Sequence, residues 1–206
     1  MTRVIAYVDG FNLYFGLKEA GFRRFYWLNI QALITKLLRP DQQLVYTHYF
    51  TSRVSSNSAD PHKAKRQSIY LDALGTLSSF GITYGHYLTS ERICRRCGAR
   101  WLVQSEKMTD VNIATELLTN AFQDSFDTAL VVSADSDLVG PIDSVLRLFS
   151  TKRVIVALPP ARSSKRLIQT ATGFTRIGRS ILAQSQLPNP VILPGGMAIY
   201  RPVDWA

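Results

Sequence analysis

The sequence predicts an α/β fold, in which a central and mostly parallel sheet is covered by helices on both faces. Two observations support this. Short runs of β-branched residues alternate along the chain with longer segments in which apolar residues recur at helical spacing. The run 129–133 (ALVVS) is apolar almost throughout, as expected for a strand buried on both faces. The length of 206 residues suffices for a single domain with its own core.

The first half of the chain predicts three strands and three helices. Asn29 is a candidate N-cap for one helix, because apolar residues at i, i+3, i+4, i+7 and i+8 follow it. The helix that precedes residue 81 is expected to end there, at a glycine. In chain order the expected elements are strand 4–8, helix 12–20, helix 30–38, strand 44–50, helix 63–80 and strand 82–88.

The second half continues the alternation after an interruption. A regular apolar stripe predicts a helix from Thr109 onward. We expect one domain over residues 1–186 with a small Cys- and Arg-rich insert at about 90–105, and a loosely packed Pro- and Gly-rich tail over 187–206. The remaining expected elements are strand 129–133, helix 138–149, strand 154–158 and a basic helix 163–171.

Composition excludes several classes of protein. The chain is 46% hydrophobic and 19% charged, which is typical of a globular protein rather than a disordered or fibrous one. No apolar run approaches the roughly 20 residues that a membrane helix needs. An aspartate at position 9 comes too early for a secretory leader, so a cytoplasmic protein is expected. Two cysteines exclude a disulfide framework.

Charge is distributed unevenly. Residues 144–203 contain nine basic side chains and no acidic one, so the rest of the chain has 15 of each sign. A basic C-terminal third beside a carboxylate-bearing N-terminal part favours a polyanionic partner, most simply nucleic acid. The alternative is a basic surface that only maintains solubility.

Four aspartates are candidate site residues, and three of them fall where ligands bind in such sheets, beyond the carboxyl ends of the strands. Asp9 follows the first strand, and Asp135 and Asp137 follow the strand at 129–133. Asp110 opens the helix that precedes that strand. Because strands of a parallel sheet end at one edge, we expect these carboxylates to converge.

Each residue also has a purely structural interpretation. Asp9 and Gly10 are typical of a hairpin turn, and Asn12 is a candidate helix cap. The helix dipole alone favours Asp110 in a first turn, and Asp137 is a candidate cap for the next helix. These interpretations do not explain why several caps should meet at one edge of one sheet.

Converging carboxylates raise one another's pKa unless a cation compensates them. A divalent ion with oxygen ligands is the simplest compensation, and Mg²⁺ or Mn²⁺ suits carboxylates and water. The three histidines are scattered along the sequence and are expected to be surface or packing residues rather than ligands: His48, His62 and His86.

At these residues the chain resembles the NYN family, a branch of the PIN-like metal-dependent ribonucleases, and especially its bacterial LabA-like members. The resemblance covers residues 3–178, with Ala134 where many relatives have glycine and Met108-Thr109 where a Gly-Val pair is frequent. The matching segments are YVDGFNLY (7–14), KMTDVNIATELL (107–118) and ALVVSADSDLVGPI (129–142).

The resemblance implies a compact PIN-like, Rossmann-like α/β/α sandwich that cuts RNA with one or two Mg²⁺ or Mn²⁺ ions and leaves 5′-phosphate and 3′-hydroxyl ends. It implies Asp9 and Asp135 as the principal metal ligands, with Asp110 and Asp137 binding directly or through water. Asn12 and Ser133 are implied as polar helpers of this catalytic site.

Cations must bring the phosphate backbone to such a site, and contacts of this kind are salt-dependent and indifferent to sequence. Tyr14 or Phe11 are candidates to stack on a base, although a core position for Phe11 is an equal alternative. The candidate contacts to single-stranded or structured RNA are Arg162, Lys165, Arg166, Arg176 and Arg179, and in the insert Arg92, Arg95, Arg96 and Arg100.

Cys94 and Cys97 have the spacing of half a zinc site. Three interpretations stay open: Zn²⁺ completed by a second copy in a homodimer or by His86 with another residue, two reduced thiols, or a redox pair.

Two other functions stay open beside the ribonuclease. One is an RNA-binding regulator of the same fold with little or no turnover. The other is a phosphatase of the haloacid dehalogenase type, although that family usually has its aspartate pair after the first strand, where this chain offers only Asp9.

Overall fold

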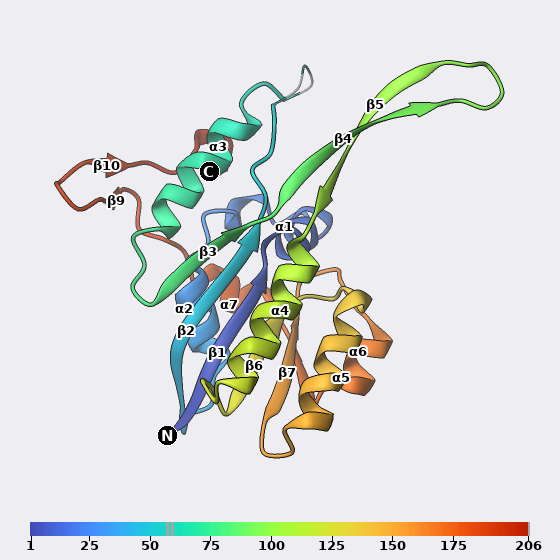
Figure 1. The fold of residues 1–206 in the computed structure, drawn as a ribbon. Helices are drawn as coiled ribbons and strands as arrows, with labels where there is room; N and C mark the ends of the chain where they lie inside the picture. The colour runs from blue at the N-terminus through green and yellow to red at the C-terminus, as the bar shows by residue number, and fades with distance from the viewer. Residues whose placement is uncertain (57, 59, 206) are drawn as a thin grey trace.

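A six-stranded sheet forms the centre of the protein in a computed structural model that describes residues 1–56, 58 and 60–205. Its order is β3-β2-β1-β6-β7-β8, and every neighbouring pair runs parallel (Figure 1). The predicted α/β fold class is therefore confirmed. The strands are β1 (Thr2–Asp9), β2 (Gln42–Thr51), β3 (Phe80–Tyr84), β6 (Thr128–Val132), β7 (Arg153–Leu158) and β8 (Gly173–Arg176).

Helices cover both faces of this sheet. One face packs against α1 (Gly10–Glu19), α2 (Ile30–Leu37), α3 (Lys63–Leu74) and α7 (Arg179–Ala183). The other packs against α4 (Thr109–Phe122), α5 (Val139–Leu148) and α6 (Lys165–Thr170). Three short 3-10 turns complete the set: η1 (Arg23–Phe25), η2 (Ser136–Leu138) and η3 (Val203–Trp205). No described helix is long and apolar enough to cross a membrane.

The central strand β1 shows why two cores form. Successive side chains of a strand point to opposite faces. Val4, Ala6 and Val8 therefore enter the core under α1 and α2, whereas Ile5 and Tyr7 enter the core under α4 and α5. A strand that is apolar on both faces is stable only between two layers of helices, and this is the position that the sequence pattern predicts for it.

Several element boundaries differ from the predicted ones. The N-cap Asn29 is confirmed, since its side chain accepts a hydrogen bond from the Ala32 amide at 2.9 Å. The helix expected over 63–80 ends at Leu74, and its expected last residue, Phe80, begins β3. Strand β8 escaped prediction because its sequence, GFTR, is short and half exposed at the sheet edge.

The insert is larger than predicted and forms an arm. Strands β4 (His86–Ile93) and β5 (Arg100–Lys107) pair antiparallel and extend away from the main sheet (Figure 1). The strand expected over 82–88 is therefore wrong as a single element, because its first part belongs to β3 and its last part to the arm. Ile93 and Trp101 are exposed on this arm.

The C-terminal tail packs closely at several points. Leu187, Val191 and Trp205 are buried, so the prediction of a loosely packed tail is wrong for them. The Trp205 ring lies 5.7 Å from the Tyr26 ring and 5.9 Å from the Tyr70 ring. Trp205 is therefore buried against two aromatic rings from distant parts of the chain, and the composition of the tail does not predict this contact. The tail also forms a small hairpin of β9 (Val191–Ile192) and β10 (Ala198–Ile199).

Candidate functional site

The sheet reverses its order of construction between β1 and β6. From β1 the chain adds β2 and β3 on one side, and from β6 it adds β7 and β8 on the other. In open α/β sheets a crevice forms beyond the strand ends at such a switch point, and ligands bind there. Asp9 is the last residue of β1, and Ser133 directly follows β6, so both lie at this point.

Asp9 ties the two strand ends together. Its Oδ1 accepts a hydrogen bond from the Asn12 amide at 2.9 Å and caps α1, and its Oδ2 accepts one from the Ser133 hydroxyl at 3.0 Å. The residue is only 5% exposed. Gly10 begins α1, which excludes the interpretation of residues 9 and 10 as a hairpin turn.

A second set of hydrogen bonds shapes the loop after β6. The Ala134 amide donates to Asn12 Oδ1 and the Asp135 amide donates to Ser133 Oγ, both at 3.0 Å. Asp135 in turn caps η2, because its Oδ1 accepts from the Asp137 amide at 3.0 Å. The interpretations of Asn12 and Asp137 as helix caps are therefore wrong: Asp9 and Asp135 perform the capping, and Asn12 bridges α1 to the loop.

The carboxylates of three aspartates act on one another at this point. Burial raises the pKa of Asp9 to about 7; its two hydrogen bonds oppose this rise, and the negative charges of Asp110 and Asp135 add to it. Asp110 lies in the first turn of α4, which packs beside β1. Asp137 is exposed in η2, two residues after Asp135. The structure thus brings Asp9, Asp110 and Asp135 within electrostatic reach.

Asp9 and Asp135 carry the carboxylate oxygens that hard divalent cations prefer as ligands. Neither Asp9 nor Asp135 forms a salt bridge within the described part of the chain. Each Asp9 oxygen accepts one hydrogen bond from the chain and retains capacity for a further partner. Among the described residues, however, no three His, Cys, Asp or Glu side chains are grouped so that they could hold a metal ion. The complete four-aspartate ligand set stays a prediction.

The backbone at Gly10, directly after Asp9, packs too closely against its neighbours to leave room for a side chain. A Cβ at this position would lie 2.6 Å from the Tyr49 ring and 2.8 Å from the Phe50 carbonyl oxygen. Tyr49 is buried, and burial together with the negative charge of Asp9 raises the pKa of its phenol. Tyr49 is therefore a neighbour of the acidic site that sequence reasoning missed.

Gly10→Ala is expected to lower the free energy of unfolding by about 1–3 kcal/mol, because the added methyl group overpacks a rigid backbone contact. The displacement of Asp9 should also weaken any activity of the site. Urea denaturation measures the first effect. Gly140→Ala is the matched control, since a Cβ there meets nothing within 4 Å. Equal loss of stability in both variants would contradict the close packing of Gly10.

The predicted basic contacts lie in two groups. Arg176 ends β8 at the carboxyl edge of the sheet, and Lys165 and Arg166 are exposed at the start of α6, which packs beside η2. Arg162 forms an ion pair with Glu19 of α1. Arg179 is exposed at the start of α7. The second group is exposed on the arm and consists of Arg92, Arg95, Arg96 and Arg100.

Cys94 and Cys97 are free thiols at the turn of the arm. His86 begins β4 at the base of the arm, eight residues before Cys94. At about 3.3 Å per residue this separates them by about 26 Å, so zinc binding by His86 together with these cysteines is wrong. The zinc site shared in a homodimer, the reduced thiols and the redox pair stay predictions.

His48 is a packing residue, as expected. Its ring stacks on Tyr7 with 5.4 Å between ring centroids, and it lies 3.6 Å from a Glu116 oxygen. Burial lowers its pKa.

Sequence reasoning also missed a cavity of about 420 Å³ on the other side of α1. α1, β2, α3 and the two 3-10 turns η1 and η3 contribute its walls. The sequence signal nearest to it is the segment GFRRFYW (21–27), in which two arginines lie between aromatic residues and which contributes Gly21, Arg23 and Tyr26 to the cavity.

The fold and the site define a class: a Rossmann-like α/β domain with an acidic site at its topological switch point. The chain belongs to the NYN domain family, whose model matches residues 3–178. This family is part of the PIN-like superfamily and is associated with RNA and with nuclease-type hydrolysis, in general with divalent metals. The bacterial LabA-like branch stays a prediction.

The proteins to which this chain is similar include one curated enzyme and one solved structure. It is 25% identical to 6-hydroxy-3-succinoylpyridine 3-monooxygenase HspA of Pseudomonas putida (strain DSM 28022 / S16), over 99% of this chain and 75% of that protein. A crystal structure of a Vibrio parahaemolyticus protein of unknown function matches 90% of this chain and 96% of its own, with a TM-score of 0.53 and 20% identity. The latter likeness supports the fold alone.

Proposed function

We propose that this protein is a metal-dependent endoribonuclease that hydrolyses RNA phosphodiester bonds at the switch point of its sheet. The observation that carries the proposal is the buried carboxylate of Asp9, which Asn12 and Ser133 hold at the junction of β1 and β6. Burial is the main cause of its raised pKa, and two further carboxylates, of Asp110 and Asp135, lie close enough to add to the rise.

Such an arrangement is unfavourable for the empty protein and favourable for a bound cation. Mg²⁺ or Mn²⁺ would be held by Asp9 and Asp135, with Asp110 and Asp137 binding directly or through water. A bound ion supplies Lewis-acid polarisation of the phosphate and activation of water. The chain itself contributes rigidity, because Ser133 Oγ links Asp9 to the Asp135 amide and so fixes two carboxylates relative to one another.

The basic groups would offset the repulsion between the carboxylates of the site and the phosphates of RNA. Lys165 and Arg166 at α6 flank η2 and the acidic site from one side. The arm extends its arginines beyond the body of the domain (Figure 1). Phosphate contacts at both places would hold single-stranded or structured RNA across the switch point. A cytoplasmic location and a homodimer are part of the proposal.

The decisive experiment is incubation of single-stranded and structured RNA with the protein in Mn²⁺, Mg²⁺ or EDTA. We expect cleavage only with metal, and a rise in melting temperature with Mn²⁺ that Asp135→Asn removes. Asp143→Asn, an exposed aspartate in the following helix α5, should behave like the wild type. Bound but intact RNA in every metal would establish an RNA-binding regulator instead. Phosphate release from small phosphomonoesters without RNA cleavage would establish a phosphatase.

The arm provides a separate prediction. Replacing both Arg95 and Arg96 with glutamate is expected to weaken RNA binding by about tenfold or more at low salt, and to make the salt dependence of binding shallower. Replacing both Lys36 and Arg39 with glutamate is the matched control, because these residues lie near the amino end of β2 and the change of charge is the same. Fluorescence anisotropy at about 50 to 200 mM salt, the range over which phosphate contacts weaken strongly, measures both. An equal loss in the two variants would leave only net charge and no role for the arm.

A further inference from the structure

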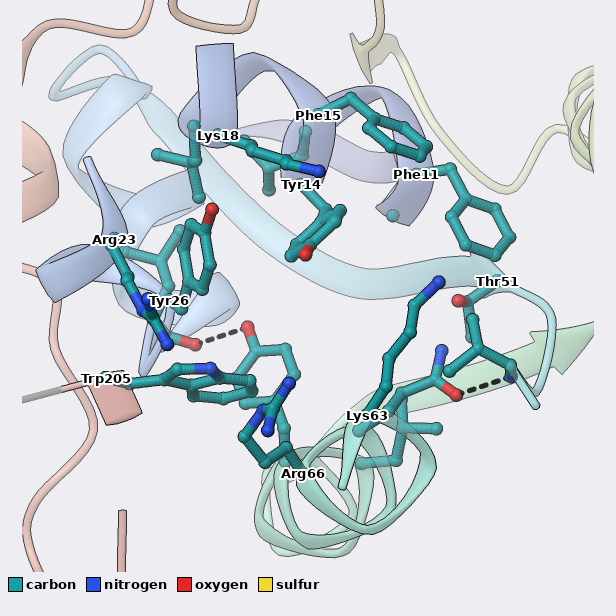
Figure 2. A pocket seen from close by; sticks show the side chains of 18 of the residues that line it. Phe11, Tyr14, Phe15, Lys18, Arg23, Tyr26, Thr51, Lys63, Arg66 and Trp205 are labelled. Atoms are coloured by element: carbon teal, nitrogen blue, oxygen red, sulfur yellow. Dashed lines mark hydrogen bonds between the residues drawn. The ribbon is translucent and has the colours of Figure 1, made fainter. Parts of the chain in front are cut away.

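The cavity on the far side of α1 has two features that together suit a planar, anionic ligand. The first is a continuous aromatic wall. Tyr14, Tyr26 and Trp205 contact one another in turn, with ring centroids 5.1 and 5.7 Å apart, and Tyr14 and Tyr26 point toward the open space (Figure 2). Phe11 and Phe15 of α1 lie beside this wall. Flat rings of this kind offer stacking surfaces to a planar ligand.

The second feature is an excess of positive charge. Four basic side chains and one carboxylate, Asp60, line the cavity. Arg66 is engaged by Asp60 and Asp204, an arrangement that fastens Trp205 to α3. In the part of the chain that the structure describes, the remaining three cations form no salt bridge: Lys18, Arg23 and Lys63. The aromatic wall, together with cations that form no salt bridge, suits a ligand in which an aromatic ring bears an anionic group.

The cavity also adjoins the acidic site. Gly10, which follows Asp9, lines it, and the Tyr49 ring that packs against Gly10 lines it as well. The first turn of α1 and the Tyr49 ring therefore border both the acidic site and this space. The volume of about 420 Å³ lies within the range of about 300–1,000 Å³ typical of small-molecule sites.

We propose that this cavity binds a single nucleotide, with its base stacked against Tyr14 and Tyr26 and its phosphate contacted by Lys63 and Lys18. Resting on the proposed function, we infer that this nucleotide is a residue of the RNA substrate close to the bond that is cut. Stacking accepts every base because each has a π face, so the cavity anchors RNA without selecting sequence. Phe11 and Phe15 would extend the stacking surface from the cavity toward Tyr87 at the base of the arm.

The test uses the full chain in EDTA, so that binding is measured without cleavage. Isothermal titration calorimetry with 5′-UMP is expected to show binding to one site. Uridine, which lacks the phosphate, and ribose 5-phosphate, which lacks the base, should each bind at least about tenfold more weakly. Tight binding of nicotinate, a pyridine carboxylate, in preference to UMP would overturn the assignment of a nucleotide.

Two pairs of variants locate the binding. Tyr14→Ala should weaken UMP binding about tenfold, whereas Tyr14→Phe keeps the ring and should retain most of it. Lys63→Met should weaken UMP but not uridine, and Lys65→Met, an exposed lysine of the same helix outside the cavity, should leave both unchanged. Melting temperatures establish that each variant is folded. Unchanged UMP affinity in folded Tyr14→Ala and Lys63→Met would overturn the proposal.

Competition with a single-stranded RNA oligomer distinguishes a nucleotide of a chain from a free one. We expect the oligomer to displace UMP, and we expect Tyr14→Ala to lower the affinity of the protein for the oligomer as well. An oligomer that binds without displacing UMP would overturn the inference that RNA occupies the cavity. RNA cleavage by a protein that does not bind UMP would overturn the nucleotide site and leave the nuclease. UMP binding without cleavage in any metal would overturn the nuclease, and with it the placement beside a cut bond, and would leave the nucleotide site.

Discussion

Asp9→Asn is expected to reduce metal-dependent RNA cleavage by about a hundredfold or more, while RNA still binds. The neutral amide keeps the size of the side chain but removes the charge that would hold a cation. Loss of a partner outside the direct ligand shell already costs about 10–100-fold in metal affinity or activity, so a direct ligand should cost at least the upper figure. Initial rates in Mn²⁺, on the same labelled RNA, provide the measurement.

The cations that would contact phosphate lie on other elements, so anisotropy should show RNA affinity within about threefold of the wild type. Asp143→Asn is again the control for loss of one negative charge at an exposed position. Cleavage by Asp9→Asn at the wild-type rate would remove Asp9 from the site and the proposed metal with it.

The same substitution is expected to stabilise the protein at neutral pH in EDTA. The pKa of Asp9 rises from its ordinary value of 3.8 to about 7 in the folded state, chiefly because the carboxylate is desolvated. The Asp9 carboxyl therefore binds its proton more tightly in the folded state than in the unfolded chain. The wild-type protein therefore loses stability as pH rises through the window between these values, and the whole cost is present above pH 7.

Asparagine has no such charge, so its advantage should be absent below about pH 4, should grow between about pH 4 and 7, and should reach about 2–4 kcal/mol above pH 7. Urea unfolding of both proteins at pH 5 and pH 8 measures this difference. Mn²⁺ should reverse the order at pH 8, because the ion compensates the wild-type carboxylate only. A pH-independent difference between the two proteins would show that Asp9 is already compensated within the chain.

The two effects of one substitution share a physical origin. A carboxylate that is costly to the empty fold is useful only to a cation that binds there, and the free energy of that binding offsets the cost. Ser133 is part of the same balance, since its hydroxyl lowers the pKa of Asp9 by donating a hydrogen bond to the carboxylate. A fold that needed only a helix cap at position 9 would bear no such cost with an asparagine or a serine.

Local patterns in the sequence determined the fold class, the central strands β1 and β6 and the helix that begins at Thr109. They did so because a strand buried on both faces and a helix with one apolar stripe are each encoded within about ten neighbouring residues. The same patterns placed Asp9, Asp135 and Asp137 at strand ends, and parallel pairing of β1 with β6 then brought Asp9 beside Ser133.

The tertiary structure alone decided what depends on partners distant in the chain. Asn12 could be assigned to the loop after β6 only from its contact with Ala134, which is 122 residues away. The predicted start of the arm was too late because only Gly85 separates β3 from β4, and one isolated glycine within an apolar run does not divide it into two strands. The cavity joins Tyr14, Lys63 and Trp205, three segments whose meeting no local periodicity encodes. Sequence thus determines which elements form, and their packing determines which side chains meet.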